Sequence, residues 1–174
     1  MLTRRSAALL LGAATLAACA KTETPEQAAA RMQAESDAAR QAIEQLAASF
    51  AAHLNAGHPD SVAALFYTSD ATLMPPNMPA AQGHDAIRAT LAGMMEGATV
   101  NLQATVQSVA ANGPLAVERG RYHLTMTPAG GPAVADSGKY LARWQRQADG
   151  SWKMAEDIWN SDAPLPPPPP TRRR

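Results

Sequence analysis

The hydrophobic period of this chain changes once, close to residue 98, and this change constrains the fold more than any other feature. Before residue 98, apolar side chains recur every three or four positions; after it, they alternate with polar ones. The first pattern is typical of helices and the second of strands with one buried face. Helices followed by a run of strands predict an α+β fold, in which helices cover one face of an antiparallel sheet.

Three helices are predicted ahead of the change. The first covers residues 28–56, which are rich in Ala, Gln and Glu. A short second helix begins at Pro59, and a third covers residues 85–96. Residues 70–74, between the last two helices, predict a short extended piece.

Four strands are predicted after the change. The first starts near residue 98, and the others cover residues 115–127, 138–147 and 152–160. The segments between them contain the Gly, Pro and Asn residues that favour turns. We expect this sheet to curl around the helices.

The N-terminus carries an export signal. Arg4 and Arg5 precede a short apolar run at residues 7–18, which ends in Leu-Ala-Ala before Cys19. This ending resembles the lipobox of bacterial lipoproteins, which implies that acyl chains such as palmitate are attached to Cys19 and that the chain is cut before it. An ordinary signal peptide with an incidental cysteine is the alternative, and both Sec and twin-arginine export stay open.

The lipoprotein resemblance also implies a location. Ala20, rather than an aspartate, follows the cysteine, which in enterobacterial lipoproteins goes with sorting to the outer membrane. We therefore expect a protein of the cell envelope, anchored by lipid to the periplasmic face of the outer membrane. The expected organisation is a signal at 1–18, a tether and helix extension at 19–38, one domain at 39–163 and a disordered Pro-rich basic tail at 164–174.

Composition excludes several classes of function. The 15 basic and 15 acidic residues give a net charge of zero, so no basic face for nucleic acid is expected. Cys19 is the only cysteine, so its acylation would leave no thiol for a disulfide, a metal or a nucleophile. The four histidines lack metal-ligand spacing, and no phosphate loop or dinucleotide fingerprint is present. We expect no metal and no cofactor.

Several segments resemble the nuclear transport factor 2-like superfamily, and within it the SnoaL-like branch. They are Asp70 to Pro76, Gly83 to Arg88, Gly138 to Leu141, Asp149 to Lys153 and Asp157 to Asp162. The resemblance covers residues 39–163. It implies a cone, in which a curved sheet is wrapped on three helices. A pocket lies at the open end of the cone. Dimers packed through the sheet are common in this superfamily, whose members include isomerases, cyclases, dehydratases and binding modules.

Strand alternation predicts which residues line the pocket. Glu118 and Tyr122 share one face of the second strand, and Tyr140 and Trp144 share the matching face of the third. A hairpin centred near Gly131 would pair Tyr122 with Tyr140 and Glu118 with Trp144. A carboxylate beside an indole on an apolar face should have a raised pKa, as a general acid or base needs. Alternatively, Glu118 lies at the sheet rim, solvated or paired to an arginine.

The inward face of the last strand depends on its turn. A two-residue turn at Asp149 and Gly150 puts Asp157 inside, whereas a three-residue loop puts Glu156 there. A bulge would let both Trp152 and Asp157 face inward. The family resemblance implies that Asp157, Trp159 and Asn160 lie at the pocket mouth, so we favour Asp157 over Glu156.

The machinery of the ketosteroid isomerase branch is missing. Its catalytic base falls on Pro75 in this chain, and its first-helix tyrosine has no counterpart, because Phe50, His53 and Leu54 hold that side. His53 is instead either a pocket acid/base or a partly buried structural residue. These absences lower the expectation of an enzyme.

Two functions are therefore expected in order of preference. The first is binding of a small apolar or amphipathic molecule, by Phe50, Tyr122, Tyr140, Trp144, Trp159 and Asn160. The second is acid/base catalysis of the isomerase, cyclase or dehydratase type, by Glu118, Asp157 and His53. A homodimer is a further expectation, although Arg119, Arg121 and His123 make the outer sheet face polar.

Overall fold

In this computed structural model of the protein, residues 23–164 are described. The signal, the lipidation site predicted at Cys19 and most of the Pro-rich tail lie outside the described residues. The described part forms three helices and six strands, with two of the strands between the second and third helices. The predicted α+β class is confirmed.

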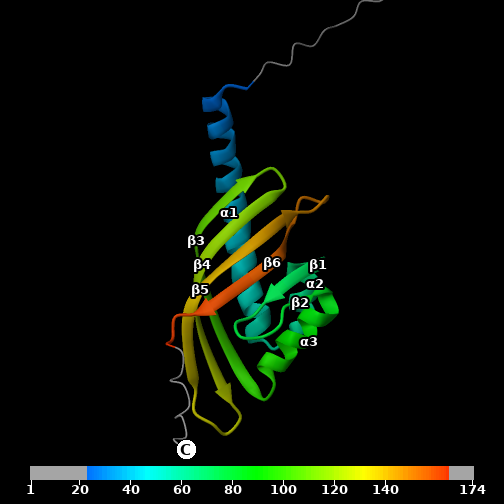
Figure 1. Cartoon of the computed structure of the whole chain (residues 1–174), viewed down its shortest axis with the longest axis vertical. Coiled ribbons are helices and arrows are strands. Elements are labelled where there is room, and N and C mark those ends of the chain that lie inside the picture. Colours follow the sequence, from blue (N-terminus) through cyan, green and yellow to red (C-terminus); the bar gives the residue numbers. More distant parts are fainter. Residues whose placement is uncertain (1–22, 165–174) are drawn as a thin grey trace, which may run out of the picture.

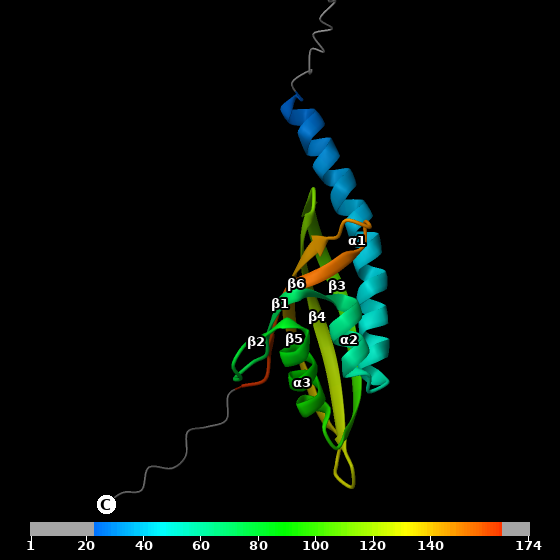
Figure 2. The ribbon, with the colours of Figure 1, turned by 90° about the vertical axis from the view of Figure 1, so that its right-hand side faces the viewer.

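The helices are α1 (Pro25–Asn55), α2 (Pro59–Phe66) and α3 (Gly83–Met95). α1 begins three residues earlier than predicted because Thr24 and Gln27 form a capping box: the Thr24 hydroxyl accepts from the Gln27 N–H, and the Gln27 side chain accepts from the Thr24 N–H. Its first turns project past the end of the sheet, whereas its second half lies along β3 (Figures 1 and 2).

The strands form one curved sheet in the order β2-β1-β6-β5-β4-β3. Their bounds are β1 (Tyr67–Met74), β2 (Ala81–Gln82), β3 (Ala98–Asn112), β4 (Leu115–Pro128), β5 (Val134–Arg146) and β6 (Trp152–Ser161). The four predicted strands are antiparallel neighbours, as expected. The sheet is not wholly antiparallel, however, because β1 is longer than its predicted extended piece and pairs in parallel with β6. This pairing satisfies the backbone groups on the otherwise free edge of β6.

The β4–β5 register differs from the predicted one by two residues. Tyr140 lies opposite Gly120, and Tyr122 opposite Gly138. A Cβ atom at Gly120 would overlap the Tyr140 ring, and one at Gly138 would overlap the Tyr122 ring and the Asn160 carbonyl. Each tyrosine ring thus lies over a glycine, which explains why the two tyrosines do not face each other. Since side chains alternate with a period of two, this shift leaves the predicted faces unchanged.

A bulge in β6 decides its inward face. Trp144 pairs with Met154 and Arg143 with Glu156, so Ala155 is one extra residue. Before the bulge Trp152 and Met154 are buried, and after it Asp157 is buried. Both sets face the helices, as the bulged alternative predicted.

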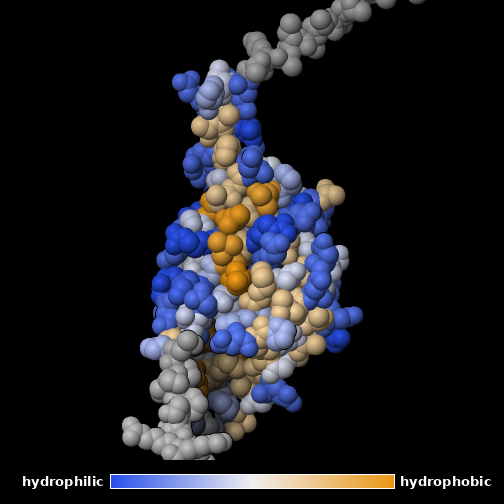
Figure 3. Space-filling model, viewed as in Figure 1, coloured by the Kyte–Doolittle hydropathy of each residue, from blue (hydrophilic) through white to orange (hydrophobic). Residues whose placement is uncertain are grey.

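The core lies between the helices and the concave face of the sheet. It includes Ile43, Val62, Phe66, Ile87 and Trp144. The opposite sheet face carries an apolar band, visible in Figure 3. The band consists of the exposed side chains Leu115, Val117, Leu141 and Ile158 on β4, β5 and β6. Ion pairs such as Arg143–Glu156 and Arg121–Asp162 flank the band. Because of the band, this face is less polar than the sequence suggested.

Candidate functional site

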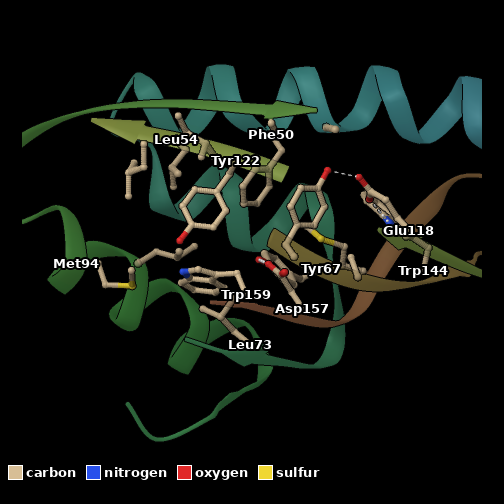
Figure 4. A pocket seen from close by; sticks show the side chains of 18 residues that line it. Phe50, Leu54, Tyr67, Leu73, Met94, Glu118, Tyr122, Trp144, Asp157 and Trp159 are labelled. Carbon is tan, nitrogen blue, oxygen red and sulfur yellow. Dashed lines mark hydrogen bonds between the residues drawn. The ribbon is translucent and has the colours of Figure 1, made fainter. Parts of the chain in front are cut away.

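A cavity of about 140 Å³ lies between α1, α3 and the concave face of the sheet. The helices supply only apolar lining, and Figure 4 shows Phe50, Leu54 and Met94 on that side. Leu73 of β1 and Leu102 and Leu124 of β3 and β4 extend this apolar surface.

The sheet supplies every polar group of the cavity. These groups are Tyr67 from β1, Glu118 and Tyr122 from β4, Tyr140 and Trp144 from β5, and Asp157 and Trp159 from β6. An apolar cavity with a few convergent polar groups is the usual form of a small-molecule site.

Glu118 is held by two donors. The Tyr140 hydroxyl donates to Oε1 over 2.5 Å, and the Trp144 indole N–H donates to Oε2 over 2.7 Å. Burial raises the pKa of Glu118, and the two hydrogen bonds partly oppose this rise. Because the side chain is 1% exposed, the alternative that placed Glu118 at a solvated rim is wrong.

Asp157 has one engaged and one unengaged oxygen. The Tyr67 hydroxyl donates to Oδ2 over 2.7 Å. Oδ1 has no hydrogen-bond partner among residues 23–164, and the Asp157 side chain lines the cavity. Burial raises the pKa of Asp157 to about 6, and the Tyr67 hydrogen bond opposes the rise. A carboxylate with a pKa near 6 and an unengaged oxygen can accept a proton or pair with a cation.

The ionisable side chains among the described lining residues of the cavity are all acids or tyrosines. Among the described lining residues no Lys, Arg or His is found, so both ionisable acids lack a cationic partner inside it. The tyrosines are neutral donors, because burial raises the pKa values of Tyr67, Tyr122 and Tyr140. The Tyr122 hydroxyl donates to Asp136 over 2.7 Å.

Most predicted site residues line the cavity, but two do not. Glu118, Asp157, Phe50, Tyr122, Tyr140, Trp144 and Trp159 all contribute to the lining. His53 does not: its Nδ1 lies 2.9 Å from the Ser49 carbonyl and its ring packs edge-on against Phe66. Phe50, one turn earlier on α1, occupies the cavity side instead.

Asn160 is the second exception. It is exposed, because alternation after the bulge turns Asp157 and Trp159 inward and therefore Asn160 outward. Pro75 is also outside the lining.

Tyr67 lines the cavity but was not predicted from the sequence. This residue directly follows α2 and precedes the predicted extended piece, so no strand pattern marked its inward face. The adjacent aromatic pair Phe66–Tyr67, both buried, was the available signal.

The described residues hold no cluster of three or more potential metal ligands. In the same part of the chain, none of the helices combines the length and apolar character needed to cross a membrane.

The model of the SnoaL-like domain family matches residues 35–156. The chain belongs to this family. The match spans the cavity-lining part of α1 and all the strands up to the bulge in β6. Among curated proteins no match to this SnoaL-like chain is found.

Solved structures share the SnoaL-like fold along most of their length. A ketosteroid isomerase-like protein from Erwinia carotovora atroseptica is 25% identical, with a TM-score of 0.65 over 71% of this chain and 96% of that one. A conserved protein from Planctomyces limnophilus is 20% identical, with a TM-score of 0.65 over 72% and 98%. A protein from Catenulispora acidiphila, solved in complex with S-DNPA, is 21% identical, with a TM-score of 0.61 over 72% and 95%.

Proposed function

We propose that this SnoaL-like domain binds a small, mostly apolar molecule that carries one polar group. The observation that carries the proposal is the Oδ1 of Asp157, which has no partner among residues 23–164, on a side chain that lines a mostly apolar cavity. The apolar body would contact Phe50, Leu124 and Trp159, and its polar group would meet Asp157. The solved complex of the Catenulispora acidiphila relative with S-DNPA supports ligand binding by this fold.

The size of the cavity suggests the size of the ligand. A dry apolar cavity of about 150 Å³ admits benzene, and this cavity measures about 140 Å³. A molecule built on one ring therefore fits without rearrangement of the core.

Thermal unfolding with a panel of single-ring compounds tests the proposal. A ligand that binds the native state raises Tm. Ala104→Leu, which fills the cavity from β3, should abolish the rise, whereas the same change at the exposed Ala92 of α3 should preserve it. A Tm shift that survives in the Ala104 variant would place the ligand elsewhere.

Acid/base catalysis is the second candidate. It is favoured by one observation: burial brings the pKa of Asp157 to about 6, within the range where a group exchanges protons at neutral pH. Turnover of a bound ring compound should then be lost on Asp157→Asn. If the variant binds the compound and turns it over at the wild-type rate, Asp157 is not the acid or base.

We also propose that the protein is a lipoprotein of the cell envelope, anchored through Cys19 to the periplasmic face of the outer membrane. The support is the Leu-Ala-Ala-Cys sequence after a short apolar run. Acyl chains together give stable membrane anchoring. Cys19→Ala should release the protein from the membrane fraction; a variant that stays with the outer membrane would contradict the proposal.

The apolar band on the outer sheet face supports a homodimer. We propose that a second copy covers Leu141 and Ile158, which lie side by side on β5 and β6. Arg119 lies beside Leu141 on β4, and Arg143 and Glu156 form an ion pair one step along the strands, so an interface here has an apolar centre and a polar rim. Sedimentation should detect a dimer that Ile158→Asp dissociates. A monomer at high protein concentration would overturn the proposal.

A further inference from the structure

Among residues 23–164, the lining of the cavity includes two acids, several aromatic rings and no cationic side chain. Glu118 and Asp157 both face it, and its aromatic lining comes from Phe50, Tyr67, Tyr122, Tyr140, Trp144 and Trp159. Buried carboxylates are ordinarily paired with a cation or neutralised. In this cavity the hydrogen-bond donors to the two acids are neutral hydroxyl and indole groups.

We propose that the ligand of this cavity is an organic amine, whose ammonium group pairs with Oδ1 of Asp157 while its ring lies among the aromatic side chains. The inference rests on the proposed binding function and names the ligand class for the same site. An ammonium group would supply the positive charge that the described lining residues lack. Aromatic faces also attract cations, more strongly where the contact is desolvated.

Asp157, rather than Glu118, is the acid that meets the ammonium. Both oxygens of Glu118 already accept hydrogen bonds, so a ligand would have to displace a donor. Asp157 has one oxygen without a partner in the described part of the chain, so it can gain a partner without losing one. Glu118 nevertheless places a second acidic side chain in the same cavity.

The same arrangement discriminates against anions. A carboxylate ligand would place a third acid in the cavity with no cation to offset it, and like charges in a desolvated space repel strongly. Neutral ring compounds should enter, but they leave Asp157 without a countercharge.

Amine binding should depend on the ionisation of Asp157. The titratable groups that face it are Tyr67 on β1, Glu118 on β4 and Tyr140 on β5; α1 and α3 contribute only apolar lining. Glu156, its neighbour in the chain, lies outside the lining and pairs with Arg143. With a pKa of about 6, Asp157 loses its charge as the pH falls, so amine affinity should drop about tenfold per pH unit below 6.

Calorimetric titration with three matched probes tests the inference: benzylamine, benzyl alcohol and benzoate. At pH 8 we expect benzylamine to bind about tenfold or more tightly than benzyl alcohol, and benzoate not to bind. Asp157→Asn should remove the preference for the amine while benzyl alcohol still binds. Glu156→Gln, the matched acid-to-amide change one residue away, should keep it.

A second measurement on the wild-type protein covers the case in which Asp157→Asn does not fold. Near pH 6, about half of the Asp157 side chains are protonated, so benzylamine should displace up to about 0.5 proton per site. The heat of binding should then vary with the ionisation enthalpy of the buffer, and benzyl alcohol should show no such variation.

The outcomes separate the two proposals. If benzyl alcohol binds as tightly as benzylamine at pH 8, or benzoate binds more tightly, the amine inference is wrong and the binding function stands. If none of the three probes binds, both are wrong.

Discussion

The hydroxyl of Tyr67 lies 2.7 Å from Oδ2 of Asp157, and this hydrogen bond joins residues 90 positions apart. It links the first residue of β1 to the middle of β6, at the place where the two strands pair in parallel and their register is interrupted. By engaging one carboxylate oxygen it fixes a side chain that lines the cavity and leaves Oδ1 without a partner among residues 23–164. Tyr67 is thus a positioning residue for the acid on which both functional proposals depend.

Tyr67→Phe should raise the pKa of Asp157 above about 6, because the hydroxyl now stabilises the charged form. Loss of the bond should also lower the free energy of unfolding by about 1–3 kcal/mol at pH 7, since a buried carboxylate loses its partner. The titration of Asp157 can be followed by NMR of its carboxyl carbon. An unchanged or lower pKa in the variant would show that the hydroxyl does not hold the ionised acid.

Asp157→Asn should change how stability depends on pH. The folded-state pKa of Asp157, about 6, lies above its ordinary value of 3.8. Below pH 4 the group is protonated in both the folded and the unfolded state, so it does not lower the free energy of unfolding. Between pH 4 and 6 the unfolded chain releases the proton while the folded protein retains it, so stability falls, by about 3 kcal/mol in total above pH 6.

The Asn variant lacks this penalty, so its stability relative to wild type should rise from pH 4 to pH 6 and then stay level. Urea unfolding at several pH values measures the difference, in which the contributions of acids that do not interact with Asp157 cancel. A difference that does not change with pH would mean that Asp157 ionises equally well in the folded and unfolded states.

Glu118→Leu should lower the free energy of unfolding by about 2 kcal/mol or more. The substitution leaves the Tyr140 hydroxyl and the Trp144 indole N–H without their acceptor, and each unpaired buried donor costs about 1–3 kcal/mol. Glu156→Leu is the matched control on the outer face of β6, where the loss of an exposed pair with Arg143 costs about 1 kcal/mol or less. Equal losses in urea unfolding would contradict the buried role of Glu118.

Alanine substitutions should distinguish the two sheet glycines from a helical one. Gly120→Ala drives a methyl group into the Tyr140 ring, and Gly138→Ala drives one into a backbone carbonyl. We expect losses of about 1–3 kcal/mol, with Gly138 the more costly because backbone cannot move aside. Gly93→Ala in α3 meets no atom within 4 Å and should stabilise by about 0.5–1 kcal/mol. A tolerated Gly138→Ala, judged by Tm, would contradict this register.

The inward faces of β4 and β5 could be predicted from sequence because alternation depends only on which residues are apolar. The register could not, since it is set by Tyr140 lying over Gly120, a contact between strands that no local pattern records. The same limit applies to Tyr67: its partner Asp157 is remote in the chain, and only the fold brings them together.

The errors at His53 and Asn160 have a different origin. Both residues lie beside cavity residues in sequence, and the prediction assigned them to the same surface as their neighbours. On α1 the cavity face is narrow enough that Phe50 and Leu54 fill it, so the ring of His53 packs against α2 instead. After the bulge in β6, strict alternation excludes Asn160.

Ala155 gives the cavity its chemistry without contributing a functional group of its own. Because it is the extra residue in β6, the alternation of inward and outward side chains shifts by one at this point. The same strand therefore buries Trp152 and Met154 before the bulge and Asp157 after it. Removal of this alanine would leave Met154 opposite Trp144 and Glu156 opposite Arg143 in an uninterrupted ladder, so Asp157 would still face inward. If the alanine stayed and the bulge were lost, strict alternation from Met154 would turn Glu156 inward and Asp157 outward. The presence of the bulge, rather than a change of side chain, therefore decides which acid of this strand is buried.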